Sequence, residues 1–143
     1  MPRKGPPSAA SGLRLRSRDM AKIGILMMNK GKWNGKRIIP KKLVDEAMAE
    51  YVKVSDSMTY GFQVWRPSYL INGERVSLVQ FSGNGGQFVQ MDERNRTMVV
   101  VTAGDYNARG LKKFSVHIYG DIVYPAMLDR KIERNDKADA SKP

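Results

Sequence analysis

The clearest alternation of apolar and polar residues lies in the middle of the chain. Val76–Phe81 and Gln87–Asp92 alternate with a period of two, which is typical of half-buried β-strands. Between them lie three glycines at positions 83 to 86, and glycine there supplies a positive φ or lets another backbone or a ligand approach closely. After a polar turn at Asp92–Arg96, the apolar run Met98–Val101 suits a strand buried on both faces. The pattern predicts three consecutive antiparallel strands, with glycines at their first turn.

Helical periodicity is found ahead of these strands. Between Ser17, a suitable N-cap, and Gly31, apolar residues recur at helical spacing and predict a first helix. Asn34-Gly35 predicts a hairpin-like turn within residues 32–39. Pro40 suits the first position of a second helix. One face of that helix is expected to carry Leu43, Val44, Ala47, Met48 and Tyr51.

The remaining segments complete the expected fold. Tyr60–Trp65 alternates like a strand that stops at Pro67, and a turn at 72–73 leads into the central strands. Residues 104–110 read as a loop, and Leu111–Tyr124 as a mixed helix closed by Pro125. Residues 1–12 form an irregular lead-in, and the charged stretch 129–143 is expected to be a disordered tail. The order of elements predicts an α+β domain, an antiparallel sheet packed with helices.

Composition narrows the chemistry. A chain of 143 residues with 41% hydrophobic residues is long enough for one domain with its own core. No cysteine occurs, which excludes disulfides, thiolate nucleophiles and cysteine zinc sites. The single histidine, His117, disfavours a histidine metal site and is expected to be a packed or half-exposed structural residue. We therefore expect no metal and no cofactor. No apolar run is long enough to span a bilayer, and the first residues lack the apolar segment of a secretory signal.

Four stretches resemble a known family. They are Ser11–Gly24, Gly31–Pro40, Tyr60–Trp65, and Ser82–Gln87 followed by a valine-rich strand. In this order they resemble the C-terminal part of serine β-lactamases and penicillin-binding-protein-like hydrolases, in the branch of class C β-lactamases, D-Ala-D-Ala carboxypeptidases and related esterases. The resemblance implies that residues 13–128 are the C-terminal portion of a domain with a partial β-lactamase/transpeptidase-like fold. The parent activity would be hydrolysis of an ester, an amide or a β-lactam through an acyl-enzyme.

Two catalytic motifs of that family do not occur in this chain. The family nucleophile is a serine with a lysine three residues later, so that the amine can take the hydroxyl proton. No serine here has a lysine at that spacing, and no tyrosine has an asparagine two residues later. We therefore assign no catalytic residue, and the resemblance implies a truncated hydrolase whose site would be completed by an N-terminal segment.

The third family motif, Lys-Thr-Gly or His-Thr-Gly, falls at Phe81-Ser82-Gly83. By resemblance, Ser82 would offer its hydroxyl, Gly83 a close backbone approach, and the N–H of Asn84 one oxyanion donor. Phe81 cannot supply the cation or imidazole that many members use to bind a substrate carboxylate. That departure favours a neutral ester or amide as the substrate. Read without the resemblance, the glycines are simply a hairpin bend.

Two alternatives of another class stay open. The first is a basic nucleic-acid-binding module, which the net charge of +11 favours. Against it, acidic residues are interspersed throughout and no helix concentrates the basic residues on one face. Arg14, Arg16 and Arg18 read as a solvated face. We expect no specific nucleic-acid binding. A non-catalytic interaction domain is the other alternative, and an exposed apolar sheet edge would mark it.

Overall fold

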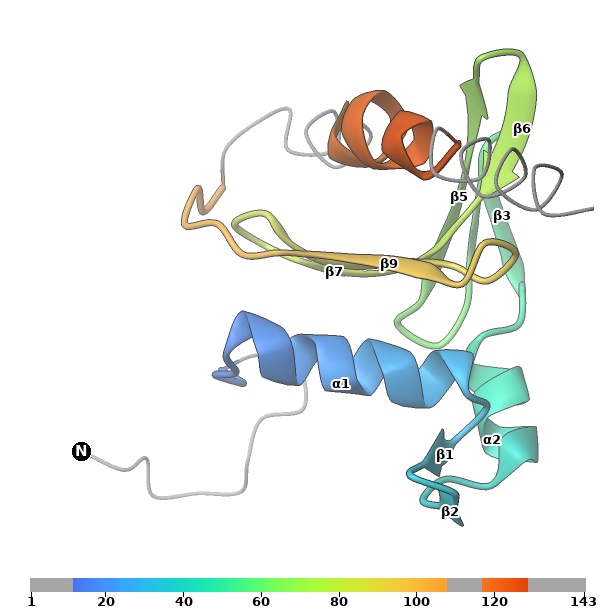
Figure 1. Ribbon diagram of the computed structural model, residues 1–143, viewed down its shortest axis with the longest axis vertical. Helices are drawn as coiled ribbons and strands as arrows, with labels where there is room; N and C mark the ends of the chain where they lie inside the picture. Colours follow the sequence, from blue (N-terminus) through green and yellow to red (C-terminus); the bar gives the residue numbers. More distant parts are fainter. Residues whose placement is uncertain (1–11, 108–116, 129–143) are drawn as a thin grey trace, which may run out of the picture.

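The computed structural model describes residues 12–107 and 117–128 (Figure 1). Antiparallel pairing joins seven strands in one sheet, in the order β3-β4-β5-β7-β8-β9 with β6 paired to β5, and β1 and β2 form a separate hairpin. The fold is therefore α+β, as the sequence predicts. In chain order the elements are α1 (Ser17–Met28), β1 (Lys32–Trp33), β2 (Lys36–Arg37), α2 (Lys41–Ala47), β3 (Val52–Ser55), β4 (Met58–Tyr60), β5 (Trp65–Ile71), β6 (Glu74–Ser77), β7 (Val79–Gly83), β8 (Gln87–Asp92), β9 (Thr97–Val101) and the helix η1 (Ile118–Val123).

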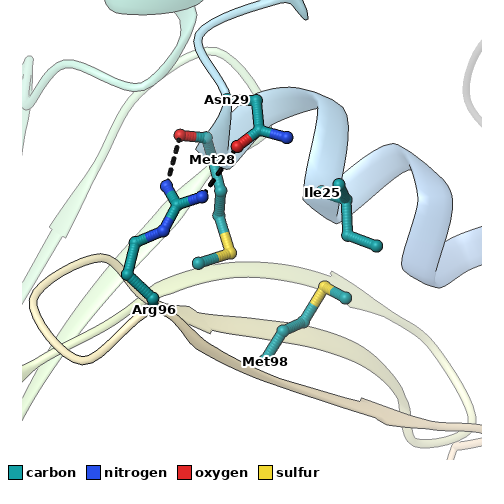
Figure 2. Close-up of a pocket in the computed structure, with 5 residues that line it drawn as sticks. All are labelled: Ile25, Met28, Asn29, Arg96 and Met98. Carbon is teal, nitrogen blue, oxygen red and sulfur yellow. Dashed lines mark hydrogen bonds between the residues drawn. The ribbon is translucent and has the colours of Figure 1, made fainter. Parts of the chain in front are cut away.

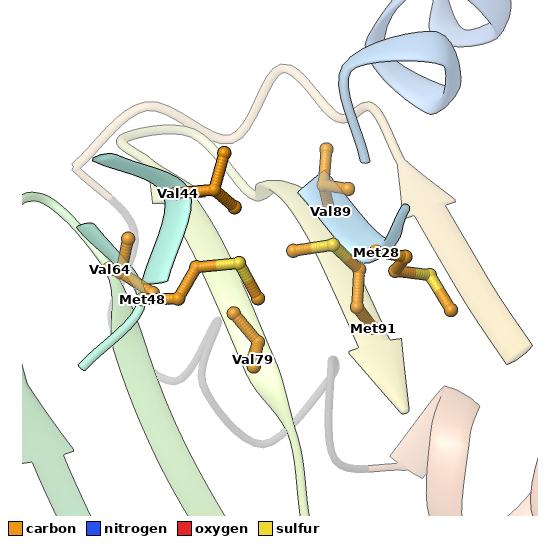
Figure 3. Close-up of a cluster of buried hydrophobic side chains, with 7 residues drawn as sticks. All are labelled: Met28, Val44, Met48, Val64, Val79, Val89 and Met91. Atoms are coloured by element: carbon orange, nitrogen blue, oxygen red, sulfur yellow. The ribbon is translucent and has the colours of Figure 1, made fainter. Parts of the chain in front are cut away.

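The described elements form three layers, with the sheet between helices (Figure 1). Helix α1 lies along one face of β8 and β9, and η1 lies on the opposite face. Between the sheet and the helices α1 and α2 lies the first apolar core, drawn in Figure 3 and formed by Met28, Val44, Met48, Val64, Val79, Val89 and Met91. Residue 24 of α1 is glycine, and a Cβ there would lie 2.3 Å from the sulfur of Met98, so α1 sits close to the strands.

The second core lies between the sheet and the C-terminal helix. It is formed by Ile71, Val76, Leu78, Tyr119 and Tyr124. Both tyrosines are buried although they are five positions apart, because the π winding of residues 118–123 returns to the same face after about five residues. The helix thus turns two large side chains towards the sheet.

Hairpins account for most of the sheet. Asn72 and Gly73 have φ of 51° and 79°, as a primed turn requires, and they join β5 to β6. Asn34-Gly35 joins β1 to β2 in the same way. Val79 pairs with Met91 in the β7–β8 hairpin, which confirms the antiparallel pairing predicted there. The two Asn-Gly signals were sufficient to locate their turns.

The predicted strand Val76–Phe81 is interrupted at Leu78, and Pro67 is the reason. Ser68 pairs with Ser77 and Trp65 with Gln80, so β6 and β7 face β5 in one unbroken register. At the intervening position the N–H of Leu78 donates to the carbonyl of Pro67 at 2.9 Å. The reciprocal bond is impossible because proline has no N–H. Residues 76–77 therefore pair with β5, and not with β8 as predicted.

The same region contradicts a second prediction. Tyr60–Trp65 is not a strand that stops at Pro67, because β4 ends at Tyr60 and β5 runs from Trp65 through Pro67. The segment between them turns sharply, with Gln63 at a φ of 61°. Strand β3 was not predicted, although Val52 and Val54 alternate with Lys53 and Ser55; all four residues are exposed.

Helix boundaries also differ from the prediction. Ser17 is the first residue of α1 and not its cap; its hydroxyl is 3.2 Å from that of Thr102. Pro40 lies at the N-cap position of α2 and not at its first helical position as predicted, so the helix begins one residue later, at Lys41. On the predicted apolar face Val44 is buried, but Leu43 is 53% exposed. Tyr51 is 54% exposed, because the helix ends at Ala47.

Two further predictions are corrected at the C-terminal side. Strand β9 contacts both layers, but each of its side chains is only half-buried because it is the last strand of the described sheet. Pro125 does not close the helix, which continues to Leu128. Pro125 lies within the continuous helical run 117–128, directly after the π-helical residues 118–123, and having no N–H it donates no hydrogen bond to the preceding turn. The predicted tail 129–143, the lead-in except Gly12, and the start of the helix at Leu111 lie outside the described residues.

Candidate functional site

The predicted site residues lie where β7 ends and turns into β8. Phe81 packs its half-buried ring against the first apolar core, so it faces α1. Ser82 follows on the opposite face and is exposed, and Gly83 and Asn84 are exposed at the turn. The four residues are contiguous, but Phe81 and Ser82 point to opposite faces of the sheet. The turn itself requires glycine at position 85, where φ is 93°.

Strand β7 has an open edge beside this turn. Gln80 is the last residue of β7 that pairs with β5, through Trp65. From Phe81 to Gly83, the strand pairs that the structure describes join β7 only to β8. No hydrogen bond from the N–H of Asn84 to another described residue is found. Backbone groups at the end of β7 are thus available to an extended ligand.

The loop after β9 is fastened to this turn by hydrogen bonds. The side chain of Asn84 donates to the Oδ1 of Asn107 at 2.9 Å, and the N–H of Asn107 donates back to the Oδ1 of Asn84 at 3.1 Å. Gln87 donates to the carbonyl of Ala103 at 2.6 Å. The N–H of Asp105 donates to the carbonyl of residue 85 at 3.2 Å. The Asn84 side chain is therefore structural, and only its backbone remains for a ligand.

A groove of about 650 Å³ opens between this turn and the start of α1. This volume is within the range of small-molecule sites. Polar walls come from the turn and from Thr102; the apolar walls are Leu13, Leu15, Met20 and Tyr106. We call these surroundings, residues 12–20, 83–87 and 102–107, the turn end of the molecule. Of the described residues that line the groove, Arg14 is the only charged one, and the structure gives it no ion pair with another residue of the described ranges. The sequence predicts an open depression at Ser82–Asn84, and Gly83 and Asn84 do line the groove although Ser82 does not; Arg14 was expected on a solvated face and not in this groove.

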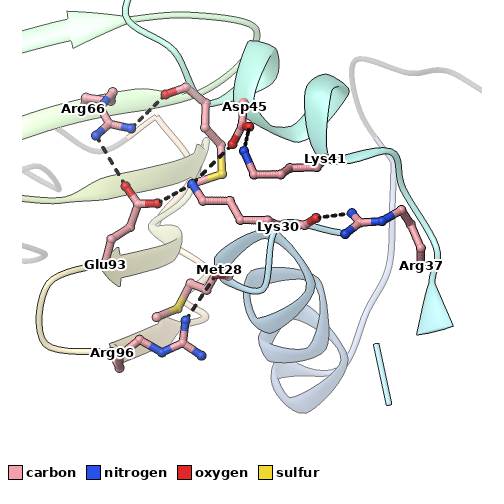
Figure 4. A network of polar contacts seen from close by, with 9 residues as sticks. Met28, Lys30, Arg37, Lys41, Asp45, Arg66, Glu93 and Arg96 are labelled. Carbon is pink, nitrogen blue, oxygen red and sulfur yellow. Dashed lines mark hydrogen bonds and ion pairs between the residues drawn. The ribbon is translucent and has the colours of Figure 1, made fainter. Parts of the chain in front are cut away.

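The other end of α1 is built differently. Lys30 lies 3.0 Å from a carboxylate oxygen of Glu93 and 3.6 Å from one of Asp45 (Figure 4). Arg66 lies 3.5 Å from the other oxygen of Glu93 and donates to the carbonyl of Met48 at 2.8 Å. Lys41 donates to Asp45 and lowers the pKa of that carboxyl. We call this region, residues 28–31, 41–48, 66 and 92–96, the ion-pair end.

A smaller hollow of about 300 Å³ lies beside α1 at the ion-pair end (Figure 2). Arg96 crosses it, donating to the carbonyl of Met28 at 3.3 Å and to Asn29 Oδ1 at 2.8 Å. The guanidinium therefore caps the last turn of α1 and compensates the negative end of its dipole. Because this cation is already engaged, the hollow offers less to a ligand than the groove does.

Other reactive side chains are engaged in structural contacts. His117 is exposed rather than packed, and its ring pairs with Asp121 one turn later. Among residues 12–107 and 117–128, no group of three or more His, Asp or Glu side chains could hold a metal ion. None of the described helices is long and apolar enough to cross a membrane.

Comparison with known proteins gives no assignment. No protein-family model matches the chain, and no curated protein matches it significantly.

Proposed function

We propose that this chain is the C-terminal part of a β-lactamase-related serine hydrolase and forms the sheet side of an acyl-transfer site. One observation carries the proposal: Ser82-Gly83-Asn84 is exposed at the end of β7, where the strand has an open edge beyond Gln80. A substrate chain can pair along such an edge. The N–H of Asn84 is then placed to donate to the carbonyl oxygen that becomes an oxyanion.

The proposal assigns the nucleophile to another segment. The chain has no serine followed three residues later by lysine, so its own hydroxyls lack the base that would activate them. Gly83 has no side chain to block a substrate, and Phe81 is turned into the core. The substrate's reacting group is therefore a neutral ester or amide, lying against a strand that presents no cation to it.

Labelling with a fluorophosphonate probe, read by intact mass, tests this function. The chain alone is expected to remain unlabelled. Produced together with the segment encoded upstream, it should support labelling of a serine in a Ser-x-x-Lys motif of that segment. Labelling of one of this chain's own serines would contradict the proposal, as would an upstream segment that lacks the motif.

A matched pair of variants probes the role of β7. Gly83→Val places a side chain where the substrate would approach, and we expect at least about a tenfold slower labelling of the completed protein. Gly83 has no positive φ, so the backbone tolerates the change, and the side chain of Gln87, whose Oε1 would lie 3.3 Å from the new Cβ, has to shift slightly. Gly104→Val is the control, since a Cβ there meets nothing within 4 Å. Equal labelling rates for the two variants would show that β7 does not form part of the acyl-transfer site.

A non-catalytic interaction domain is the second candidate, and the exposed edge strand β3 favours it. Val52 and Val54 are exposed on this strand, and beside it the ring of Tyr51 meets that of Phe62 at 5.0 Å. Sheet edges of this kind pair readily with other chains. If this role were the main one, Val54→Lys would abolish partner capture while Gly83→Val left it unchanged.

Nucleic-acid binding is expected to be nonspecific. The charge of +11 favours counterion release, which does not depend on sequence. Titration of two unrelated duplexes at low and physiological salt checks this. A sequence preference that survives physiological salt would favour the nucleic-acid alternative.

A further inference from the structure

The groove at the turn end combines one unpaired cation with apolar walls. Leu13 is 79% exposed and Tyr106 is 66% exposed, and both line the groove. Leu15 and Met20 add further apolar surface to the lining. Among the described residues that line the groove Arg14 is the only charged one, so none of these offers a carboxylate that competes for its guanidinium. Apolar surface gathered around a concave site is typical of ligand grooves.

The loop that carries Tyr106 and the start of α1, which form part of the groove wall, are held by hydrogen bonds and packing. A Cβ at Gly85 would lie 3.0 Å from the ring of Tyr106, so that glycine makes room for the ring to lie against the turn. The paired amides of Asn84 and Asn107 fix the loop that carries the ring. The hydroxyls of Ser17 and Thr102, 3.2 Å apart, join the start of α1 to the end of β9. These contacts reduce the ordering that binding requires of the loop 102–107 and of the start of α1, which favours affinity.

The two acidic residues of the turn end, Asp19 and Asp105, do not line the groove. Asp19, in the first turn of α1, pairs with Lys22 at 2.7 Å. Asp105 donates its N–H to the turn, and its side chain does not line the groove. Arg16 and Arg18, which are exposed in the same stretch, add positive charge. The field in the groove thus favours an anion over a neutral group or a cation.

We propose that this groove binds an amphiphilic carboxylate, an apolar chain with one terminal carboxylate. The chain would lie between Leu13 and Tyr106, and the carboxylate would accept two hydrogen bonds from the guanidinium of Arg14. This binding is proposed for the protein itself, without any other segment.

Calorimetric titration of the 143-residue chain with three probes tests the site: octanoate and octyltrimethylammonium below their micellar concentrations, and octan-1-ol below its solubility limit. We expect octanoate to bind at least about tenfold more tightly than octan-1-ol, because only the carboxylate engages Arg14. The cationic probe should be the weakest. Equal binding of octanoate and octan-1-ol would overturn the proposal, and so would tighter binding of the cation.

Two arginine variants separate the site from general charge. Arg14→Gln should lower octanoate affinity about tenfold and bring it to the level of octan-1-ol. Arg18→Gln removes the same charge outside the groove and should change the affinity less than about twofold, because an exposed charge at a distance is screened. Equal losses in the two variants would mean nonspecific attraction to a basic chain and would refute the site.

A further variant tests the apolar wall. Tyr106→Ser should lower the affinity for octanoate and for octan-1-ol by the same factor, since both probes have the same apolar chain. An unchanged affinity for both probes would mean that the apolar part of the probe does not contact Tyr106, and it would overturn the proposal. Because these titrations need no nucleophile, their failure would leave the labelling test of the proposed function intact. A failed labelling test would likewise leave the carboxylate site standing.

Discussion

The two ends of α1 are stabilised by different interactions. At the ion-pair end Lys30 and Arg66 share the carboxylate of Glu93, and Arg96 caps the helix, so each of these cations has a partner. At the turn end neutral amides hold the loop, and Arg14 has no partner among the described residues. One end uses its charges to stabilise the fold, and the other leaves a charge available in a groove. The difference indicates where a ligand can bind without displacing a structural contact.

The largest effect is expected from Gly31→Ala at the ion-pair end. Gly31 follows α1 with a φ of 82°, and a Cβ there would lie 2.2 Å from the carbonyl oxygen of Ile39. Backbone must move to relieve this overlap, so we expect a loss of roughly 3 kcal/mol or more in the free energy of unfolding. Gly35→Ala is the control: its φ is 79° but nothing lies within 4 Å, so about 1 kcal/mol is expected. Denaturant titration of both variants measures the difference, and equal losses would contradict the overlap.

The next effect concerns the buried carboxylate at the end of β8. Tyr119 donates its hydroxyl to Asp92 at 2.5 Å, and Asp92 also accepts from the N–H and the amide of Asn95. Tyr119→Phe should cost about 1–3 kcal/mol in unfolding free energy, because one acceptor position of a buried carboxylate loses its donor. Asn95 keeps the remaining bonds, so the variant is expected to fold. An unchanged stability would show that water replaces the phenol.

The same contact predicts a pH dependence. Burial, and then the hydrogen bond to Asp92, raise the pKa of Tyr119 above its ordinary value of 10.0. The folded state therefore favours the neutral phenol, and its stabilisation is complete below pH 10 and is lost as the pH rises further. The advantage of the native protein over Tyr119→Phe should shrink above pH 10, in denaturant titrations at pH 8 and pH 11. A constant difference would contradict the shift.

At the turn end the Asn84–Asn107 pair should show measurable coupling. The two side-chain bonds are exposed, so a coupling energy of about 0.5–1.5 kcal/mol is expected from a double-mutant cycle with Asn84→Ala and Asn107→Ala. The cycle also cancels the strain that alanine meets at position 107, where φ is 63°. Additive losses would mean that the amides do not hold the loop.

The smallest effect is expected from neutralising one ion pair. Glu93→Gln should cost about 0.5–1 kcal/mol at low salt and less at high salt, because Lys30 and Arg66 are only partly shielded from water. Asp56→Asn is the control, since this carboxylate is 98% exposed and pairs only with Lys53; its change should stay within about 0.3 kcal/mol. A larger loss for Asp56→Asn would reverse this ranking.

Local signals account for what the sequence predicted correctly. Asn34-Gly35 and Asn72-Gly73 set their turns by themselves, because asparagine and glycine readily adopt positive φ. The first helix and the β7–β8 hairpin follow from apolar periodicity and glycine breaks. These features need no information from distant residues, so their positions could be read from the chain.

Long-range pairing accounts for the errors. The break at Leu78 depends on Pro67, eleven positions earlier, and only the strand register brings them together. The groove is likewise formed by three separate segments, so Arg14 looked like a solvated charge in the sequence. The candidate residues Ser82, Gly83 and Asn84 could be predicted as exposed at a turn, but the opposite orientation of Phe81 depends on which face α1 covers.

The π winding of η1 has a consequence for tolerated chain length. Tyr119 and Tyr124 share the sheet face although five positions separate them. Removing one exposed residue between them, such as Ile122, would leave the two tyrosines four positions apart, which is the spacing of one face in an ordinary α-helix. The helix therefore contains one residue more than burial of both rings requires. A related chain shorter by one residue here would keep the same contact with the sheet through ordinary α-helical geometry.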